Sequence, residues 1–503
     1  MTHPTTTGMQ TDPASATGAE QSLIDQAFSR AAGARRIEGN RVRLLRDAAE
    51  NYPAWLDAIA VAERYVYFEN YIVRDDAAGR QLAEALTARV HEGVSVRLLY
   101  DWMGAVGKTS PRFWASLRQA GIEVRCFNPF RLSSPLGWVQ RNHRKSVVVD
   151  GRVGFITGLC VGDEWVGDPA RGIAQWRDTG IEVRGPAVAE IERAFTRMWA
   201  LVGQPIPDAE GQAREKIPAA GDVAMRVVAS EPNRAELLRL DQVIATAARE
   251  TLWLSDAYYA GVPSHVQALC SAALDGVDVR LLLPGATDLP VVRLFSRAGY
   301  RPLLEAGVRV FEWNGPMLHS KTAVADGRWA RVGSSNLNLA SWLANYELDA
   351  VVEDAGFADI MEQQYFDDLT NATEVLLRAD RRRITRRAPS KPRSRARRGG
   401  SAGRAAVGAL RLGNTVTAAA TSHRALTSQD AGILAVAGMA LIAAAIATLY
   451  WPPLFAVPFA VLIAWVGGAL VLRAYRLRRC RRPVPAEPDT TPVRLPVKQV
   501  PPE

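Results

Sequence analysis

The sequence predicts an α/β fold made of two similar halves, followed by a helical hairpin that spans a membrane. Strand-like and helix-like segments alternate between residues 40 and 372. A ten-residue segment occurs twice, as HRKSVVVDGR from His143 and as HSKTAVADGR from His319. Two long apolar runs without a charged residue lie near the C-terminus.

The composition of the 503-residue chain allows more than one domain and a large core. Hydrophobic residues make up 48% of the chain, and the net charge of +9 is unevenly spread along it. No paired spacing is found among the cysteines, so we expect a reducing compartment without a disulfide framework or a zinc knuckle. The cysteines are Cys126, Cys160, Cys270 and Cys480.

The N-terminal segment, residues 1–39, is expected to be disordered. Residues 1–22 are polar and lack the apolar region of a secretory signal peptide.

Residues 40–205 and 225–372 form the two expected halves, joined by the Pro/Gly-rich linker 206–224. Each half begins with an apolar strand, continues through a helix-like stretch to a second strand, and then through a helix that ends at a glycine. The repeated segment follows in both halves. The folded region therefore reads as an internal duplication with a mixed or parallel sheet.

Residues 431–473 are predicted to form two transmembrane helices. The apolar runs 431–449 and 454–472 are each long enough to span a bilayer core, and a Tyr-Trp-Pro-Pro turn separates them. A pair of buried core helices is the alternative, but neither run leaves a polar face for water.

Basic segments flank this hairpin on both sides, in the tether 373–430 and in the Pro-rich tail 474–503. This pattern predicts a multi-pass protein of the inner membrane with its catalytic region on the cytoplasmic side. Residues 378–404 hold twelve basic residues and one acidic residue. We expect them to bind anionic lipids.

The repeated segment places histidine and lysine on one strand face, because residues two apart in a strand point the same way. We therefore pair His143 with Lys145, and His319 with Lys321. An imidazole can attack phosphorus or transfer a proton, and an ammonium group can neutralise a phosphate oxygen. A single His-x-Lys is usually incidental, but a repeat of the whole segment in a chain with only six lysines indicates function.

Four carboxylates complete the expected catalytic group. Asp150 and Asp326 belong to the repeated segment, yet each precedes a glycine, which is typical of a two-residue hairpin turn. Their odd spacing from the histidines favours a role in the turn over direct contact with the imidazoles. Asp178 and Glu347 follow in strand-like segments, and each is expected to orient the histidine of its own half.

Small residues with hydrogen-bond donors follow the repeats and are expected to bind the phosphate of a substrate. In the second half these are Gly333, Ser334 and Asn336, and in the first half Gly158 lies at a matching place. No carboxylate cluster suggests a metal site, so we expect chemistry without a metal or another cofactor.

These segments resemble the phospholipase D superfamily, whose motif is HxKx4D followed by Gly-Ser-x-Asn. The segments RNHRKSVVVDGRVGFITGLCVGDEW, WRDTGIEVRGPAV and MLHSKTAVADGRWARVGSSNLN are similar to the bacterial cardiolipin synthase branch. The resemblance covers roughly residues 40–370. It implies a duplicated phospholipase D fold, with two α/β/α sandwich halves and the active site between them.

The resemblance also implies roles. It makes His143 the nucleophile and His319 the general acid and base, and it supports the carboxylates at 178 and 347 as orienting groups. The chain departs from the branch at Thr157 and Cys160, where glycine and asparagine are usual. It also departs in carrying its apolar spans at the C-terminal end.

The expected function is that of a membrane-tethered phosphatidyltransferase similar to cardiolipin synthases. It would pass a phosphatidyl group through a phosphohistidine to an alcohol such as phosphatidylglycerol. A phospholipase D that uses water and releases phosphatidic acid is the alternative. A nuclease is disfavoured by the apolar spans and the short basic run, and a scaffold without activity by the intact histidines and lysines. The sequence leaves the head groups and the oligomeric state open.

Overall fold

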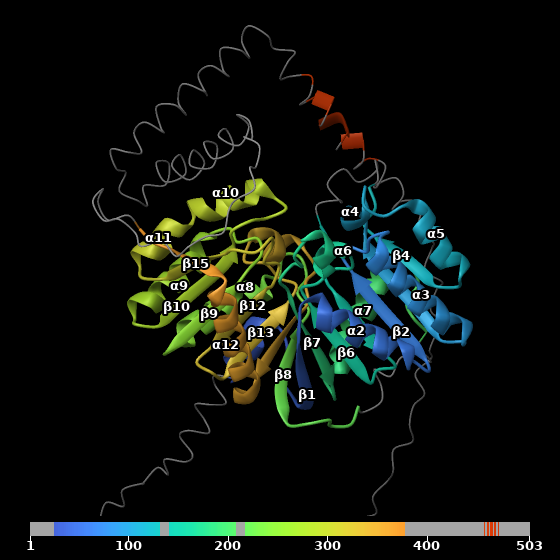
Figure 1. Ribbon diagram of the computed structural model, residues 1–503, viewed down its shortest axis with the longest axis horizontal. Helices are drawn as coiled ribbons and strands as arrows, with labels where there is room; N and C mark the ends of the chain where they lie inside the picture. The colour runs from blue at the N-terminus through green and yellow to red at the C-terminus, as the bar shows by residue number, and fades with distance from the viewer. Residues whose placement is uncertain are drawn as a thin grey trace, which may run out of the picture. The chain divides into compact units, whose positions relative to one another are not determined.

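The computed structural model describes residues 25–130, 140–207 and 217–377, and scattered positions between 457 and 471. The first three ranges fall in one compact unit. They form a mixed α/β fold around a large sheet, which confirms the α/β part of the predicted fold class (Figure 1).

The predicted transmembrane hairpin and the basic tether and tail lie almost entirely outside the described residues. Within the part that is described, no helix combines the length and the apolar character needed to cross a bilayer.

The first half alternates strands and helices in the expected order. β1 starts at Ile37, and α7 closes the half. Its elements are β1 Ile37–Arg46, α2 Asp47–Ala60, β2 Tyr65–Asn70, α3 Ala77–His91, β3 Ser95–Asp101, α4 Trp102–Ala105, α5 Pro111–Gln119, β4 Glu123–Phe127, β5 Ser146–Val149, β6 Val153–Thr157, α6 Asp163–Val166, η2 Pro169–Arg171, β7 Thr179–Arg184 and α7 Val188–Leu201.

The second half repeats this order and adds an edge strand. Its elements are β8 Val223–Val228, α8 Glu236–Ala247, β9 Thr251–Ser255, α9 Pro263–Leu274, β10 Asp278–Pro284, α10 Pro290–Ala298, α11 Tyr300–Glu305, β11 Arg309–Trp313, β12 Thr322–Ala325, β13 Trp329–Gly333, η3 Ala340–Ala344, β14 Asp349–Glu353, α12 Ala355–Thr370 and β15 Ala372–Val375.

The strands hydrogen-bond in the order β15-β11-β10-β9-β12-β13-β14-β8-β1-β7-β6-β5-β2-β3-β4. In each half three parallel strands meet an antiparallel set: β2, β3 and β4 beside β5, β6 and β7, and β9, β10 and β11 beside β12, β13 and β14. The halves join where β1 pairs antiparallel with β8. The strands that follow the two motifs, β5 and β12, therefore occupy equivalent places.

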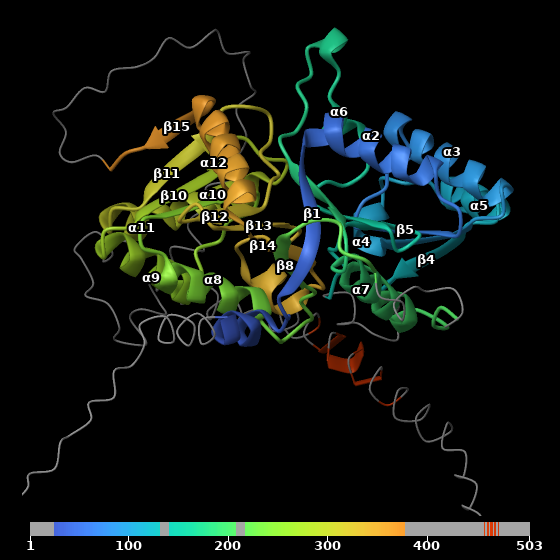
Figure 2. The same cartoon turned by 90° about the horizontal axis from the view of Figure 1, so that it is seen from below.

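The core explains why the halves form one body. α7 and α12 share one apolar cluster with strands of both halves, in which Phe195 of α7 and Met361 of α12 are buried. Helices α2, α3 and α5 pack on a second cluster within the first half, and α8, α9 and α11 on a third within the second (Figure 2). Burial of apolar side chains from both halves in one cluster favours their association.

The predicted disordered segment 1–39 extends too far, because residues 25–32 are helical and β1 has begun by Ile37. Phe28 and Ala32, one helical turn apart, pack on the core of the second half, and Asp25 forms an ion pair with Arg226. The short apolar stripe of this helix is hidden in an otherwise polar sequence, which is why composition alone missed it.

Candidate active site

The two motif histidines lie in extended segments that cross to the other half. The backbone N–H of His143 donates to the carbonyl oxygen of Tyr346 at 2.9 Å, and that of His319 donates to the carbonyl oxygen of Arg177 at 2.7 Å. Each histidine is therefore held beside a segment of the opposite half, at the junction between the halves.

The carboxylate partner of each histidine also comes from the opposite half. Nδ1 of His143 lies 2.9 Å from Oε2 of Glu347, and Nδ1 of His319 lies 2.6 Å from Oδ2 of Asp178. The expected pairing of each histidine with the carboxylate of its own half is therefore wrong. The cause is the backbone pairing, which brings the residue before each carboxylate against the opposite histidine.

Both carboxylates are fixed by further hydrogen bonds. Glu347 accepts from the Ser334 hydroxyl at 2.6 Å and from the Asn345 amide at 3.2 Å. Asp178 accepts from the Trp165 indole N–H at 3.1 Å. These bonds hold the acceptor oxygens where the imidazoles need them.

The site keeps both carboxylates ionised. Burial raises the pKa of each, but the interaction with the paired imidazole and the charge of the nearby lysine outweigh it, so the pKa values of Asp178 and Glu347 lie below their usual range. An ionised carboxylate accepts the Nδ1 hydrogen and fixes the imidazole tautomer, which leaves Nε2 of His143 and of His319 available for chemistry.

Burial also favours neutral imidazoles. Together with Lys145 and Lys321 it lowers the pKa of His143, and together with Lys321 it lowers that of His319 to about 4. Each histidine responds to the lysine of the other half as well as to its own. The four side chains therefore belong to one electrostatic site.

Each lysine is held beside the histidine of its own half, as the strand parity predicts. Nζ of Lys145 donates to the carbonyl oxygen of His143 at 2.6 Å, and Nζ of Lys321 donates to that of His319. Burial lowers the pKa of Lys321 to about 8. Both ammonium groups are buried and can neutralise a bound phosphate.

Aromatic rings around the imidazoles were missed by sequence reasoning. Tyr71 packs edge-on against His143 with ring centroids 4.9 Å apart. Trp165, Trp176 and Tyr258 lie around His319 at centroid distances of 5.5, 5.8 and 5.8 Å. No regular spacing in the sequence marks these residues.

Asp150 and Asp326 lie in the hairpin turns after β5 and β12, not beside the imidazoles. Each has a positive φ and precedes a glycine with a positive φ, as a tight hairpin turn requires. The Asp150 carboxylate accepts three backbone N–H groups, from Glu63, Arg64 and Tyr65 at 2.8 Å each. Asp326 binds the start of β9 in the same way. This corrects their grouping with the catalytic residues and supports the turn role.

The four residues expected at the phosphate have different surroundings. A Cβ at Gly158 would overlap the Asp178 carboxylate, and a Cβ at Gly333 would overlap that of Asp349, so both glycines make room for a carboxylate. Ser334 is engaged with Glu347. The amide oxygen of Asn336 has no hydrogen-bond partner among the described residues.

Arg144, between the two motif residues of the first half, points the other way. Its buried guanidinium donates to the carbonyl oxygens of Glu347, Ala194 and Ser230 at 3.0 to 3.1 Å. It therefore ties the first motif to α7 and to the segment that follows β8.

Within the described residues, no three His, Cys, Asp or Glu side chains gather in an arrangement that could hold a metal ion. The described site consists of imidazoles, ammonium groups, carboxylates and aromatic rings.

Comparisons with known proteins agree with this geometry. The family model described as "Cardiolipin synthase, PLD-like domain" matches residues 55–199 and 241–369. The chain is 35% identical over 340 residues to a cardiolipin synthase of Alkalihalophilus pseudofirmus, which covers 67% of each chain. It is also 35% identical over 365 residues to cardiolipin synthase A of Pseudomonas aeruginosa, which covers 70% of this chain and 71% of that one.

Among solved structures, the chain is similar to a phosphatidylserine synthase of Haemophilus influenzae. The TM-score is 0.56 and the sequence identity 14%, and the match covers 70% of this chain and 92% of that one. At this identity the likeness supports the fold alone.

Proposed function

The chain belongs to the cardiolipin synthase family of phospholipase D-like proteins, and we propose that it is a phosphatidyltransferase of the cardiolipin synthase type. The observation that carries this function is the pair of crossed contacts, His143 with Glu347 and His319 with Asp178. They engage Nδ1 of each ring and leave both Nε2 atoms available, and the site also holds two buried lysines, which together form the set that a phosphodiester transfer needs.

In the first step Nε2 of His143 attacks the phosphorus of a donor phospholipid. The bond between phosphorus and the head-group oxygen breaks, and His319 gives a proton to that oxygen, so the head group leaves as an alcohol. Glu347 stabilises the positive charge that develops on the His143 ring. Lys145 and Lys321 neutralise the non-bridging oxygens.

Proton donation by His319 requires a protonated ring, although its pKa is about 4 in the unliganded site. A phosphodiester carries a negative charge, which favours the imidazolium and raises this pKa when the substrate binds. Binding of the substrate therefore favours the protonated form of His319 that the first step requires.

In the second step an acceptor hydroxyl attacks the phosphohistidine. His319 takes the hydroxyl proton, the bond from phosphorus to nitrogen breaks, and His143 returns to its neutral form. With phosphatidylglycerol as both donor and acceptor, the products are cardiolipin and glycerol.

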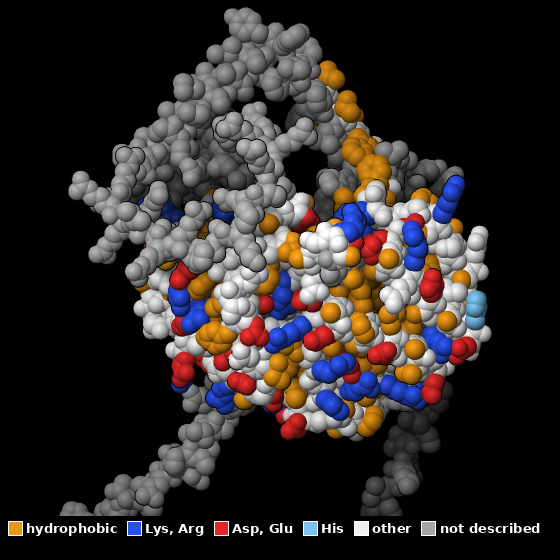
Figure 3. Space-filling view, in the orientation of Figure 1, with side chains coloured by type: hydrophobic (Ala, Val, Ile, Leu, Met, Phe, Trp, Pro, Cys, Tyr) orange, Lys and Arg blue, Asp and Glu red, His pale blue; other side chains and the backbone are white. Residues whose placement is uncertain are grey.

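The membrane setting belongs to the same proposal. The apolar runs in 431–473 would anchor the chain as a two-span hairpin in the inner membrane, with the catalytic unit on the cytoplasmic side. The basic residues in 378–404 would hold it against anionic lipids. On the face of the folded unit seen in Figure 3, basic and acidic side chains are interspersed, which gives little support to nucleic acid as substrate.

The test is an assay of the purified full chain in phosphatidylglycerol vesicles, with product analysis by mass spectrometry and trapping of a phosphatidyl-enzyme by a denaturing alkaline quench, because the bond from phosphorus to nitrogen is hydrolysed in acid. We expect cardiolipin and glycerol, and a covalent adduct that is absent from His143→Ala. Phosphatidic acid as the main product, without transfer to added alcohol, would favour hydrolysis instead. Neither a lipid product nor an adduct would overturn the proposal.

A further inference from the structure

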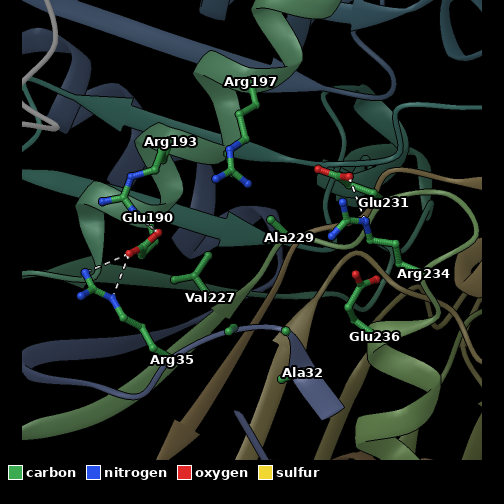
Figure 4. A pocket seen from close by; sticks show the side chains of 13 residues that line it. Ala32, Arg35, Glu190, Arg193, Arg197, Val227, Ala229, Glu231, Arg234 and Glu236 are labelled. Atoms are coloured by element: carbon green, nitrogen blue, oxygen red, sulfur yellow. Dashed lines mark hydrogen bonds and ion pairs between the residues drawn. The ribbon is translucent and has the colours of Figure 1, made fainter. Parts of the chain in front are cut away.

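A pocket lies next to the segment that carries the first motif, behind the residues to which Arg144 donates hydrogen bonds. It encloses about 290 Å³ between residues 32–35, α7, β8 and the segment 229–236 (Figure 4). Ala194 and residues 229 and 231 line it, and Arg144 donates to the carbonyl oxygens of Ala194 and Ser230. The pocket and the His143 segment therefore share a wall.

Four arginines dominate the lining of this pocket. Two carboxylates hold three of the guanidinium groups: Glu190 pairs with two of them, and Glu231 pairs with the third at 3.3 Å. Since a guanidinium has five N–H donors, an arginine held by one carboxylate keeps donors for a ligand. The arginines are Arg35, Arg193, Arg197 and Arg234.

Two groups in the pocket lack a partner among the described residues. Arg197, which is exposed, makes no hydrogen bond or ion pair there, and Figure 4 shows its guanidinium turned toward the side of the pocket that holds Arg193. Glu236 is 7% exposed, and its Oε2 has no hydrogen-bond partner. A buried carboxylate oxygen without a partner is unfavourable. The pocket therefore offers a ligand one unpaired acceptor, on Glu236, and one unpaired cation, on Arg197.

This combination selects the chemical class of a ligand. A phosphate group matches the guanidinium donors, which bind its oxygens in pairs. A hydroxyl or ammonium hydrogen on the same molecule would satisfy Glu236. Inorganic phosphate offers the phosphate oxygens without an alcohol hydroxyl, whereas a glycerol phosphate offers both.

We propose that this pocket binds a small phosphate ester whose alcohol part carries a hydrogen-bond donor. The ligand is either a free glycerol phosphate or the head group of a lipid. The site is separate from the catalytic histidines, so its test does not depend on the transfer reaction.

The experiment measures binding of glycerol 3-phosphate and of inorganic phosphate to the full-length purified chain by titration calorimetry. Arg197→Ala is the main variant, and it should fold because the exposed side chain loses no hydrogen bond or ion pair with the described residues. Arg112→Ala on α5 is the matched control, an exposed arginine outside the pocket that likewise makes no hydrogen bond or ion pair with the described residues. We expect Arg197→Ala to weaken both ligands at least about tenfold and the control to leave both unchanged.

Glu236→Gln tests the role of the carboxylate acceptor separately from that of the arginines. It should weaken glycerol 3-phosphate and leave inorganic phosphate unchanged, because only the ester carries an alcohol hydroxyl apart from its phosphate group. The Arg197-dependent binding should persist in Lys321→Met, which removes an ammonium of the catalytic site. Equal affinity in the Arg197 variant and the control would overturn the proposal, as would loss of this binding in Lys321→Met.

Nanodiscs of phosphatidylglycerol distinguish the source of the ligand. If glycerol 3-phosphate binds the chain in detergent and is displaced by such nanodiscs but not by phosphatidylcholine nanodiscs, the head group is the occupant. If phosphatidylglycerol leaves the binding unchanged, the occupant is the free ester. Either result agrees with the proposed binding site, and each identifies one source of the ligand.

Discussion

The two halves differ at the strand pair behind each motif. In the second half Gly333 of β13 lies opposite Asp349 of β14, and a Cβ on the glycine would overlap the carboxylate. In the first half Thr157 of β6 lies opposite Gly180 of β7, and a Cβ on that glycine would overlap the Asn51 side-chain oxygen and would lie 2.8 Å from the Thr157 hydroxyl oxygen. The side chain that fills this space comes from β14 in the second half, whereas in the first half the space is filled from β6 and α2.

This exchange explains why Thr157 departs from the family pattern. A glycine is needed at 333 because Asp349 occupies the space beside it, and no such carboxylate exists beside position 157. Asp349 also brings Arg331 and Asp241 into the core, whereas Phe155 takes the place of Arg331 in the first half. The duplicated fold has kept the substrate-facing groups similar while the packing behind them diverged.

The largest effect is expected from breaking the crossed carboxylate pairs. Glu347→Gln and Asp178→Asn should each lower kcat/KM for transfer by about 10³-fold, because each leaves a histidine without its orienting acceptor. A phosphatidyl ester of 4-nitrophenol separates the two, since its leaving group needs no proton. This substrate should rescue Asp178→Asn, which disables the acid His319, and should not rescue Glu347→Gln, which disables the nucleophile His143.

The opposite rescue pattern would contradict the assignment. It would mean that Glu347 serves the acid, as pairing within each half would require. Circular dichroism of both variants provides the control for folding.

A smaller contrast is expected between Asn336 and Cys160, which occupy equivalent places after β13 and β6. The amide oxygen of Asn336 has no hydrogen-bond partner among the described residues, and the NH₂ group of the same amide can donate to a phosphate oxygen, so Asn336→Ala should lower kcat by about 10²-fold. Cys160 is buried, and burial raises the pKa of its thiol. Cys160→Ala should therefore change kcat by less than about threefold. Equal losses in the two variants would show that both halves contact the phosphate alike.

The turn aspartates offer a comparison in stability. Asp150 is 2% exposed, and one of its three hydrogen bonds to backbone N–H groups is buried and two are part-buried, whereas two of the three that Asp326 accepts are exposed and one is part-buried. Asn tolerates the positive φ of both sites. Asp150→Asn should lower the free energy of unfolding by about 2 kcal/mol and Asp326→Asn by about 1 kcal/mol, measured by urea denaturation. Equal changes would indicate that burial does not separate the two turns.

The smallest expected effect is a shift in pH dependence caused by Lys321. Its pKa of about 8 means that the ammonium loses its proton above that pH, so kcat/KM should fall as the pH rises through 8. Lys321→Arg keeps the charge and should remove this alkaline limb, at a lower maximum rate. An unchanged limb in the variant would assign it to another group.

Stability should move in the other direction over the same range. Between pH 8 and about 10.5 the unfolded lysine binds a proton that the folded one does not, so the folded state gains stability as the pH rises. A thermal melt of the native chain across this range separates the two effects.

Much of the site could be predicted from the sequence because the signals were local. The repeat marks His143, Lys145, His319 and Lys321, and strand parity places each lysine beside its histidine, as the contacts bear out. The glycine after each aspartate predicts the turn. The aromatic rings around His319 carried no such signal, since residue 165 of α6 and residues 176 and 258 of two loops meet there only in the folded structure.

The sequence by itself determined the α/β class, the duplication and the reactive side chains, because residue type and short spacing decide these. It could not assign Glu347 to His143 or Asp178 to His319. Both halves show the same local pattern, so the crossed and uncrossed pairings read alike along the chain. Only the folded structure separates them, because the backbone of each histidine segment hydrogen-bonds to the opposite half.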